Sequence, residues 1–210
     1  MPGVFLMKRF LLCCAAALLP FLAACSFNLI PQTDFTETRT FDLAAPEPLE
    51  TLPFIVDVEA FSNECSGRFK MVFREDANRV EVDEYNRWST PPAAMLTKYL
   101  AARFAAQTSN QGRTGKPVFV LDGSVLNCEM NRTKKQADLM VHFFVVEQGD
   151  DTFRITGTKD YAIPVENATA EAFADGMNKA ASQFADHIVS VLKDELRKRD
   201  DEAKAAGEKK

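Results

Sequence analysis

Hydrophobic and polar residues alternate in six segments of the chain. In residues 54–61, the apolar Phe54 and Val56 share one side of an extended backbone. The acidic Asp57 and Glu59 share the other side. Alternation with this period predicts β-strands. The six segments fall into two groups of three: 54–61, 69–74, 79–85, 118–129, 137–147 and 153–163.

Each group of strands is followed by a segment whose apolar residues recur every three or four positions, which predicts an amphipathic helix. The first helix begins at Pro91 and Pro92, where missing amide donors cost nothing. The second is capped by Asn167 or Thr169. Beyond it, residues 197–210 form a charged tail. The apolar stripe of the second helix consists of Phe173, Met177, Ala180, Phe184, Ile188, Val191 and Leu192.

The order strand-strand-strand-helix therefore occurs twice. Two helices on one face of a mostly antiparallel sheet of about six strands form an α+β sandwich. We expect residues 54–196 to form a single domain of this class. Within 137–147, apolar residues occupy both sides of the strand, with His142 among them. The second side is then either a surface for a partner or is covered by the segment that precedes the domain.

The first 24 residues predict a secretory signal peptide. Lys8 and Arg9 precede an apolar run that is too short to span a membrane and ends in small residues. The run closes on Leu22-Ala23-Ala24-Cys25, which resembles a bacterial lipobox. In such proteins the Cys25 thiol would carry diacylglyceryl, and a peptidase would cut before it. A plain signal peptide followed by an ordinary cysteine is the alternative.

Cleavage would change the composition that matters for function. Removing the first 24 of 210 residues leaves 186, and it takes away two bases and no acid, so the formal charge goes from −5 to −7. A net acidic chain is a poor candidate for binding nucleic acid. We then interpret residues 25–53 as a lipidated N-terminus and a tether rich in Thr and Pro. Ser26 after the cysteine favours the outer membrane over the inner membrane.

Two further cysteines, Cys65 and Cys128, would share an exported, oxidising compartment. If the first strands of the two groups lie parallel and adjacent, both cysteines reach the same edge of the sheet. We predict a disulfide between them, with two buried thiols as the alternative. The sequence offers little for catalysis, because its two histidines, His142 and His187, are far apart and neither sits in a known motif. We expect no metal, no cofactor and no enzyme activity.

The most distinctive run comprises Met71-Val-Phe-Arg74, then Tyr85-Asn-Arg87-Trp88-Ser-Thr-Pro91-Pro92. An F-x-L element, Phe41-Asp-Leu43, precedes it. With these residues the sequence resembles the ABC-type transport auxiliary lipoproteins, the family that includes the third component of the paraquat-inducible (Pqi) system. The residues that carry the resemblance, and that would form its structural or partner motif, are Arg74, Tyr85, Arg87, Trp88, Pro91 and Pro92.

The resemblance implies a lipid-anchored, non-enzymatic component of a lipid transport system on the periplasmic side of the outer membrane. Its partners would be a periplasmic protein with mammalian-cell-entry domains and an inner-membrane ABC permease and ATPase. A homo-oligomer is a further expectation. The alternative function is an envelope-assembly lipoprotein that partners an outer-membrane β-barrel. Within the motif, Trp88 either packs the first helix on the sheet or contacts a partner.

Overall fold

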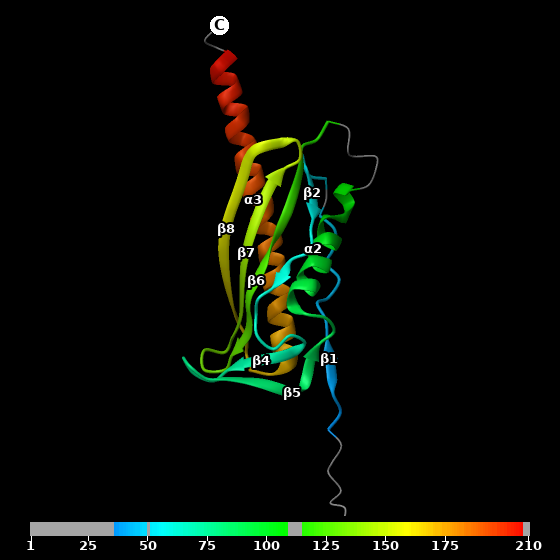
Figure 1. Cartoon of the computed structure of the whole chain (residues 1–210), viewed down its shortest axis with the longest axis vertical. Helices are drawn as coiled ribbons and strands as arrows, with labels where there is room; N and C mark the ends of the chain where they lie inside the picture. The colour runs from blue at the N-terminus through cyan, green and yellow to red at the C-terminus, as the bar shows by residue number, and fades with distance from the viewer. Residues whose placement is uncertain (1–35, 50, 109–114, 208–210) are drawn as a thin grey trace, which may run out of the picture. The chain divides into compact units, whose positions relative to one another are not determined.

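Three long antiparallel strands form the centre of the sheet. They are β6 (Val118–Asn131), β7 (Gln136–Glu147) and β8 (Asp150–Pro164). The computed structural model describes residues 36–49, 51–108 and 115–207. β6 pairs with β7, and β7 with β8, along nearly their whole lengths. A bulge at Leu126 shifts the β6–β7 register by one residue. β8 is the last strand of the sheet in this direction (Figure 1).

Five shorter strands complete the described sheet on the other side of β6. The sheet order is β1-β5-β4-β6-β7-β8, and β2 and β3 pair with β6 beside this path. Because β2, β3 and β4 all run parallel to β6, the sheet is mixed, with eight strands in the described residues. The predicted α+β class is confirmed, whereas the sheet is less antiparallel than expected. The short strands are β1 (Arg39–Phe41), β2 (Ile55–Val58), β3 (Ser62–Asn63), β4 (Lys70–Arg74) and β5 (Val80–Trp88).

Two helices follow the strands in the expected order. α2 (Pro92–Thr108) begins at Pro92, and α3 (Ala170–Gly207) follows Thr169. The Thr169 hydroxyl accepts a hydrogen bond from the Ala172 amide at 3.2 Å, so Thr169 is the cap. α2 packs on β2 and β3, while α3 packs on β7 and β8 (Figure 1). α3 continues through the predicted tail as far as Gly207.

The hydrophobic core lies between the helices and the sheet. β7 contributes alternate residues to it, from Ala137 to Val145, and all of them are buried. The predicted stripe of α3 meets them, because Phe184 makes edge contacts with the rings of Phe61 and Phe143. The predicted stripe of α3 therefore lies on the side of the helix that faces the sheet, with Val191 only half-buried.

The segment before the domain packs on this body where the structure describes it. β1 pairs in parallel with β5, the Ala44 amide donates to Asn178 on α3, and the Leu49 amide donates to the carbonyl of Arg103 on α2. These contacts lie within residues 25–53, which the sequence assigns to the tether. Phe41, Leu43 and Leu49 each place an apolar side chain against the core, which is the physical reason that the segment adheres.

Candidate docking surface

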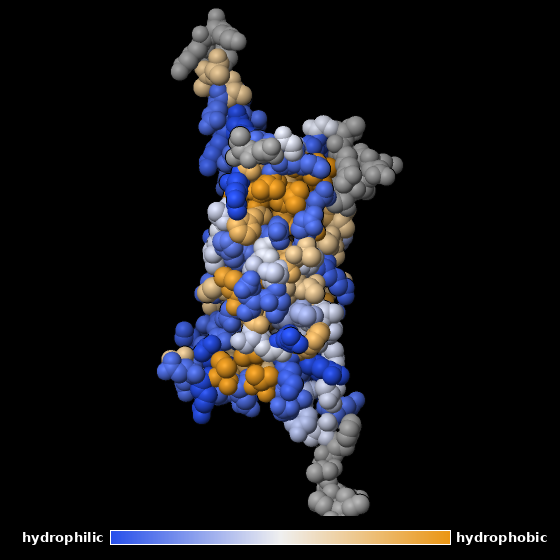
Figure 2. Space-filling model, in the orientation of Figure 1, coloured by the Kyte–Doolittle hydropathy of each residue, from blue (hydrophilic) through white to orange (hydrophobic). Residues whose placement is uncertain are grey.

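The side of β6–β8 that faces away from the helices carries apolar side chains that the described residues leave partly exposed. We define the open face as Val120, Met140, His142, Phe144 and Val146. Val146 is 39% exposed, and the other four are half-buried. Val120 lies opposite Val146 in the β6–β7 register. In Figure 2 the apolar area in the upper part of the view lies over β6 and β7.

Side chains on the open face are held by one another. The rings of His142 and Phe144 meet edge to face with centroids 4.6 Å apart. The Arg154 guanidinium of β8 lies 5.0 Å from the centroid of the Phe144 ring. Nδ1 of His142 is 2.9 Å from the hydroxyl of Thr158. Because these groups come from two neighbouring strands, the open face is an ordered surface.

The two alternatives for this side of β7 can now be separated within the described residues. Residues 39–49 lie along β5, α2 and α3, as the hydrogen bonds of Ala44 and Leu49 show. The described part of the predicted tether therefore does not cover the open face. What remains is a surface with both apolar and cationic character, which suits contact with another molecule.

Polar side chains occupy the other end of the same sheet surface. Glu129 lies opposite Asp138 in the register, and its side chain is only 8% exposed and forms an ion pair with Arg74. Arg74 binds Glu129 with Nε and, at 2.8 Å, with Nη2. This contact raises the pKa of the guanidinium. The pKa of Asp138 is also raised, and burial is the main cause. The hydrogen bond from Gln136 opposes the rise, whereas repulsion from the Asp160 and Glu129 carboxylates adds to it.

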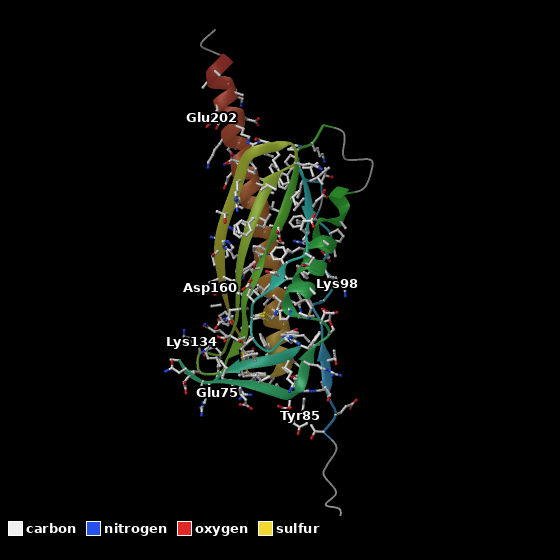
Figure 3. All side chains as sticks on the ribbon, viewed as in Figure 1. Glu75, Tyr85, Lys98, Lys134, Asp160 and Glu202 are labelled. Atoms are coloured by element: carbon white, nitrogen blue, oxygen red, sulfur yellow. The ribbon has the colours of Figure 1, made fainter. Side chains whose placement is uncertain are left out.

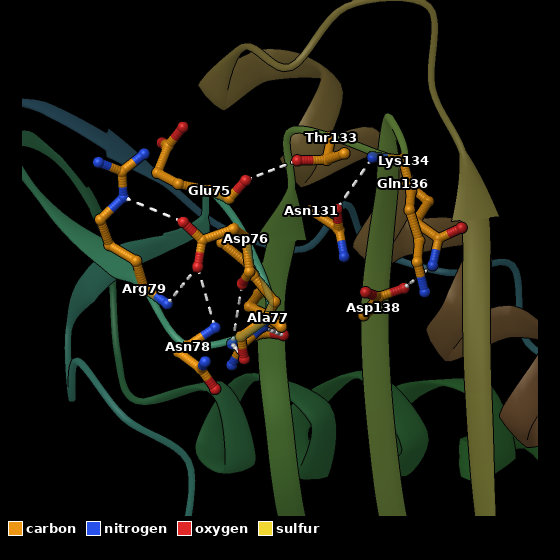
Figure 4. A network of polar contacts seen from close by, with 12 residues as sticks. Glu75, Asp76, Ala77, Asn78, Arg79, Asn131, Thr133, Lys134, Gln136 and Asp138 are labelled. Atoms are coloured by element: carbon orange, nitrogen blue, oxygen red, sulfur yellow. Dashed lines mark hydrogen bonds and ion pairs between the residues drawn. The ribbon is translucent and has the colours of Figure 1, made fainter.

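A loop between β4 and β5 closes this polar end. Asp76 accepts hydrogen bonds from the amides of Asn78 and Arg79 at 3.0 and 2.9 Å (Figure 4). The Thr133 hydroxyl, in the turn between β6 and β7, donates to the carbonyl of Glu75 at 2.6 Å (Figure 4). These bonds connect the β4–β5 loop to the β6–β7 turn, so the polar end is structural and only the apolar end remains open.

The motif residues divide into buried and exposed groups. Trp88 is buried, with its ring 5.0 Å from that of Phe173 on α3, so it packs the helix layer on the sheet. Pro92 is buried at the start of α2, and Pro91 is half-buried. Arg74 belongs to the polar end already described. Trp88 therefore has a structural role in this fold, although its ring contact is with the second helix and not with the first helix as predicted.

Tyr85 and Arg87 are the exposed members of the motif. Tyr85 is 49% exposed on β5, near the bottom of the view in Figure 3. Nε of Arg87 donates to the Thr40 hydroxyl at 3.4 Å and so reaches β1. On the same strand Val80 and Val82 are also exposed. We call Val80, Val82 and Tyr85 the β5 patch; only Tyr85 was signalled by the sequence motif.

Cys65 and Cys128 are both thiols in this structure, so the predicted disulfide is not formed here. β2 does lie parallel to β6, which was the condition for that prediction, and the Glu64 amide donates to the carbonyl of Val125. Burial raises the pKa of each thiol, and the proximity of Cys65 adds to the rise at Cys128. Cys128 Sγ lies 3.6 Å from Met177 Sδ, while Cys65 Sγ donates to Asn63 Oδ1 at 3.4 Å.

Two pockets that are lined mainly by apolar residues are small. The pocket that Cys128 lines with Leu43 and Met177 has a volume of about 10 Å³, and its neighbour along α2 has about 60 Å³. Sites for drug-sized ligands span roughly 300–1,000 Å³. Two larger depressions, of about 380 and 340 Å³, are lined mainly by polar residues at the start of α3 and beside Arg74. Neither apolar pocket has room for a lipid acyl chain.

Residues for metal or acid–base chemistry are dispersed. No group of three His, Cys, Asp or Glu residues with metal-binding geometry occurs within residues 36–49, 51–108 and 115–207. His142 belongs to the open face, and His187 packs its ring against Phe143. Burial lowers the pKa of His187, and Lys159 lowers it further. Neither helix of the described chain is both long and apolar enough to cross a bilayer.

Comparison with known families gives this geometry a context. The model of the "ABC-type transport auxiliary lipoprotein component" family matches residues 67–189, more than half of the chain. The chain belongs to this family. The match runs from just before β4 into α3, and it includes the open face and every motif residue from Arg74 to Pro92. No curated protein matches the chain.

Solved structures support the fold of this auxiliary lipoprotein. Protein XCC0632 from Xanthomonas campestris, assigned to the family DUF330, superposes with a TM-score of 0.59 at 14% identity. The alignment covers 77% of this chain and 99% of that one. A crystal structure of an uncharacterized protein superposes with a TM-score of 0.57 at 13% identity, covering 74% of this chain and 99% of that one. At such identities the likeness establishes the fold alone.

Cys25, the predicted lipidation site, lies outside the described residues.

Proposed function

We propose that this protein is the outer-membrane-anchored docking component of an ABC-type lipid transport system. Its partner in the periplasm would be a protein with mammalian-cell-entry domains, linked to an inner-membrane permease and ATPase. The observation that carries the proposal is the family match over residues 67–189, since that family is described as a transport auxiliary lipoprotein. The role would be performed by contacts between proteins rather than by chemistry.

The open face is the surface that this proposal assigns to the partner. It combines exposed apolar area, from Val120 and Val146, with aromatic and cationic groups, from Phe144 and Arg154. Aromatic residues and arginine are enriched at protein interfaces, and a preformed arrangement lowers the entropic cost of binding. The small volume of the apolar pockets supports a docking role over a role in which the domain encloses a lipid.

Affinity purification from detergent-solubilised membranes tests the proposal. We expect the wild-type lipoprotein to recover a cell-entry-domain protein with its permease and ATPase. Val146→Glu should abolish this recovery, because a carboxylate would be desolvated in the interface. Val82→Glu is a matched control, since Val82 in the β5 patch is the same residue type with the same 39% exposure. We expect the control to recover the partners as the wild type does.

Other outcomes of this experiment would contradict the proposal in different ways. Recovery of an outer-membrane β-barrel assembly protein, without any cell-entry-domain protein, would replace it with the envelope-assembly alternative. Loss of the partners in Val82→Glu but not in Val146→Glu would move the interface to the β5 patch and overturn the assignment of the open face.

The anchor is tested separately. Metabolic labelling with radioactive palmitate should label the wild-type protein, and Cys25→Ala should lose the label, because diacylglyceryl transfer requires that thiol. Fractionation of labelled membranes should place the protein in the outer membrane. Equal labelling of the two forms would remove Cys25 as the lipidation site while leaving the docking surface untested by that result.

A further inference from the structure

The outer edge of β8 is a long row of backbone groups without a strand partner in the described chain. β8 pairs with β7 in an unbroken register from Arg154 to Pro164, and it ends the sheet order. In Figure 1 its outer side faces no other described element, because α3 packs behind the strands. An edge of this length is a template for pairing with another strand.

The usual protections of an exposed edge are few along β8. Proline occurs only at its end, Pro164, and the register shift lies near the β7–β8 hairpin rather than in the strand centre. Lys159 is the one lysine of the strand. Natural edge strands are commonly blocked by several of these devices together. The centre of β8 therefore has neither a proline nor a bulge that would block pairing.

The side chains of β8 are complementary to themselves about Gly157. In an antiparallel pair related by a twofold axis at this residue, positions equally distant from Gly157 lie opposite each other. Arg154 then faces Asp160 of the second copy, Thr156 faces Thr158, and Phe153 faces Tyr161, while Ile155 faces Lys159 as the one unmatched pair among these. Arg154 and Asp160 are both exposed on the open-face side of the strand, and Figure 3 shows Asp160 at this edge of the sheet.

We propose that two copies of this chain associate through their β8 edges, in antiparallel register centred on Gly157, to form one continuous sheet across a twofold axis. The register is selected by two symmetric Arg154–Asp160 pairs, since shifting the centre by one residue to position 156 or 158 separates them. Opposite charges placed directly across neighbouring strands stabilise the pairing, and like charges oppose it. The proposal concerns the edge of the sheet, and of the groups assigned to the partner it uses only Arg154.

Charge reversal gives a test that does not depend on the folding of a single variant. The full-length, detergent-solubilised lipoprotein would be studied by sedimentation velocity over a range of concentrations. The wild type should form a dimer. Arg154→Asp and Asp160→Arg each place like charges at both symmetric positions. Each should raise the dimer dissociation constant by about tenfold or more.

Mixing the two variants provides the decisive measurement. In the mixed pair each Asp at position 154 faces an Arg at position 160, and each native Arg154 faces a native Asp160, so the heterodimer should form as readily as the wild-type dimer. The double variant R154D/D160R should also dimerise. Arg79→Asp, a reversal at an arginine that is 71% exposed on the β4–β5 loop, is the control and should remain dimeric.

Three results would overturn the proposal. They are a wild type that is monomeric at all concentrations, single variants that dimerise as the wild type does, and a mixture of the two variants that fails to associate. Capture of the transport partners by Asp160→Arg, which leaves Arg154 and the open-face residues unchanged, reads out the docking proposal separately, so the failure of one proposal is distinguishable from the failure of the other.

Discussion

The two faces of β7 differ although their residues alternate along one strand. On the helix side, Leu139, Val141 and Phe143 are buried against α3. On the open face, Met140, His142 and Phe144 are only half-buried, and they are held by contacts with one another and with β8. The helix side thus serves the stability of the domain. The open face is apolar without contributing much to the core, which is the property expected of a surface kept for binding.

Substitution of neighbouring phenylalanines should separate these roles most strongly. Phe143→Ala removes a ring that packs on Phe184 and His187 and leaves a cavity, so we expect the free energy of unfolding to fall by about 3–5 kcal/mol. Phe144→Ala loses only a half-exposed ring with its edge and cation contacts, and should cost about 1 kcal/mol or less. Urea denaturation of the two variants measures both values. Equal losses would show that the open face is part of the core.

Oxidation of the cysteine pair should act on the helix side alone. Cys128 is buried there, and Cys65 lies just beyond β3. A Cys65–Cys128 disulfide would close a loop of about 64 residues and stabilise the fold by about 4 kcal/mol in the chain-entropy model. Mass spectrometry of alkylated peptides under non-reducing conditions should detect the bridge in protein from membranes, and partner capture should not change on reduction. Full alkylation of both thiols would contradict the prediction.

The Arg74–Glu129 pair belongs to the polar end of the sheet surface, where side chains stabilise the fold instead of forming the open face. Arg74→Ala would leave the Glu129 carboxylate, 8% exposed, without its counter-ion, and we expect a loss of about 2–4 kcal/mol. Replacing both residues by methionine should cost less than the single change, because no buried charge then remains. Thermal unfolding of the three proteins provides the comparison. A double variant less stable than Arg74→Ala would show that the pair contributes more than charge compensation.

Periodicity predicted the helix side of the fold well. The stripe from Phe173 to Leu192 and the alternation around Val141 were read from the sequence because each packs against a partner in the same chain. The pairing of the short strands was not predictable in this way. β2 and β3 join β6 in parallel across a long sequence separation, and alternation within a strand carries no information about which strand lies beside it.

The candidate surface was predictable only in part. The sequence showed that residues 139–146 are apolar on both sides, but it could not show where the preceding segment packs. Its course depends on the packing of a few apolar side chains, such as Leu43, and on single hydrogen bonds such as Ala44 to Asn178, and neither leaves a periodic signal. The motif from Trp88 to Pro92 carried the resemblance to the family, but the buried Trp88 itself serves the packing of the fold. The contact of Arg154 with Phe144 depends on the β7–β8 register, and no local pattern encodes it.

The smallest expected effect on stability comes from substitution of Asp138, at the polar end of the sheet surface that carries the open face. Its pKa is raised above the unfolded value, mainly by burial and then by the nearby Asp160 and Glu129 carboxylates. The folded state therefore binds this proton more tightly than the unfolded state does. Protonated Asp138 makes its full contribution to the free energy of unfolding below about pH 4. This contribution is lost as the pH rises through the pKa that Asp138 has in the folded state. At neutral pH the charged group opposes folding.

Asp138→Asn should accordingly raise the free energy of unfolding at pH 7 by less than about 0.5 kcal/mol, while keeping an oxygen that can accept the hydrogen bond from Gln136. The advantage should disappear as the pH falls below about 4, where the wild-type carboxyl is protonated as well. Chemical denaturation of both proteins at the two pH values measures the difference. Asp201→Asn, on the exposed end of α3, removes the same charge away from the sheet and controls for net charge. A variant less stable than the wild type at pH 7 would mean that the Asp138 carboxylate stabilises the polar end. The structural part of this sheet surface would then extend closer to Met140.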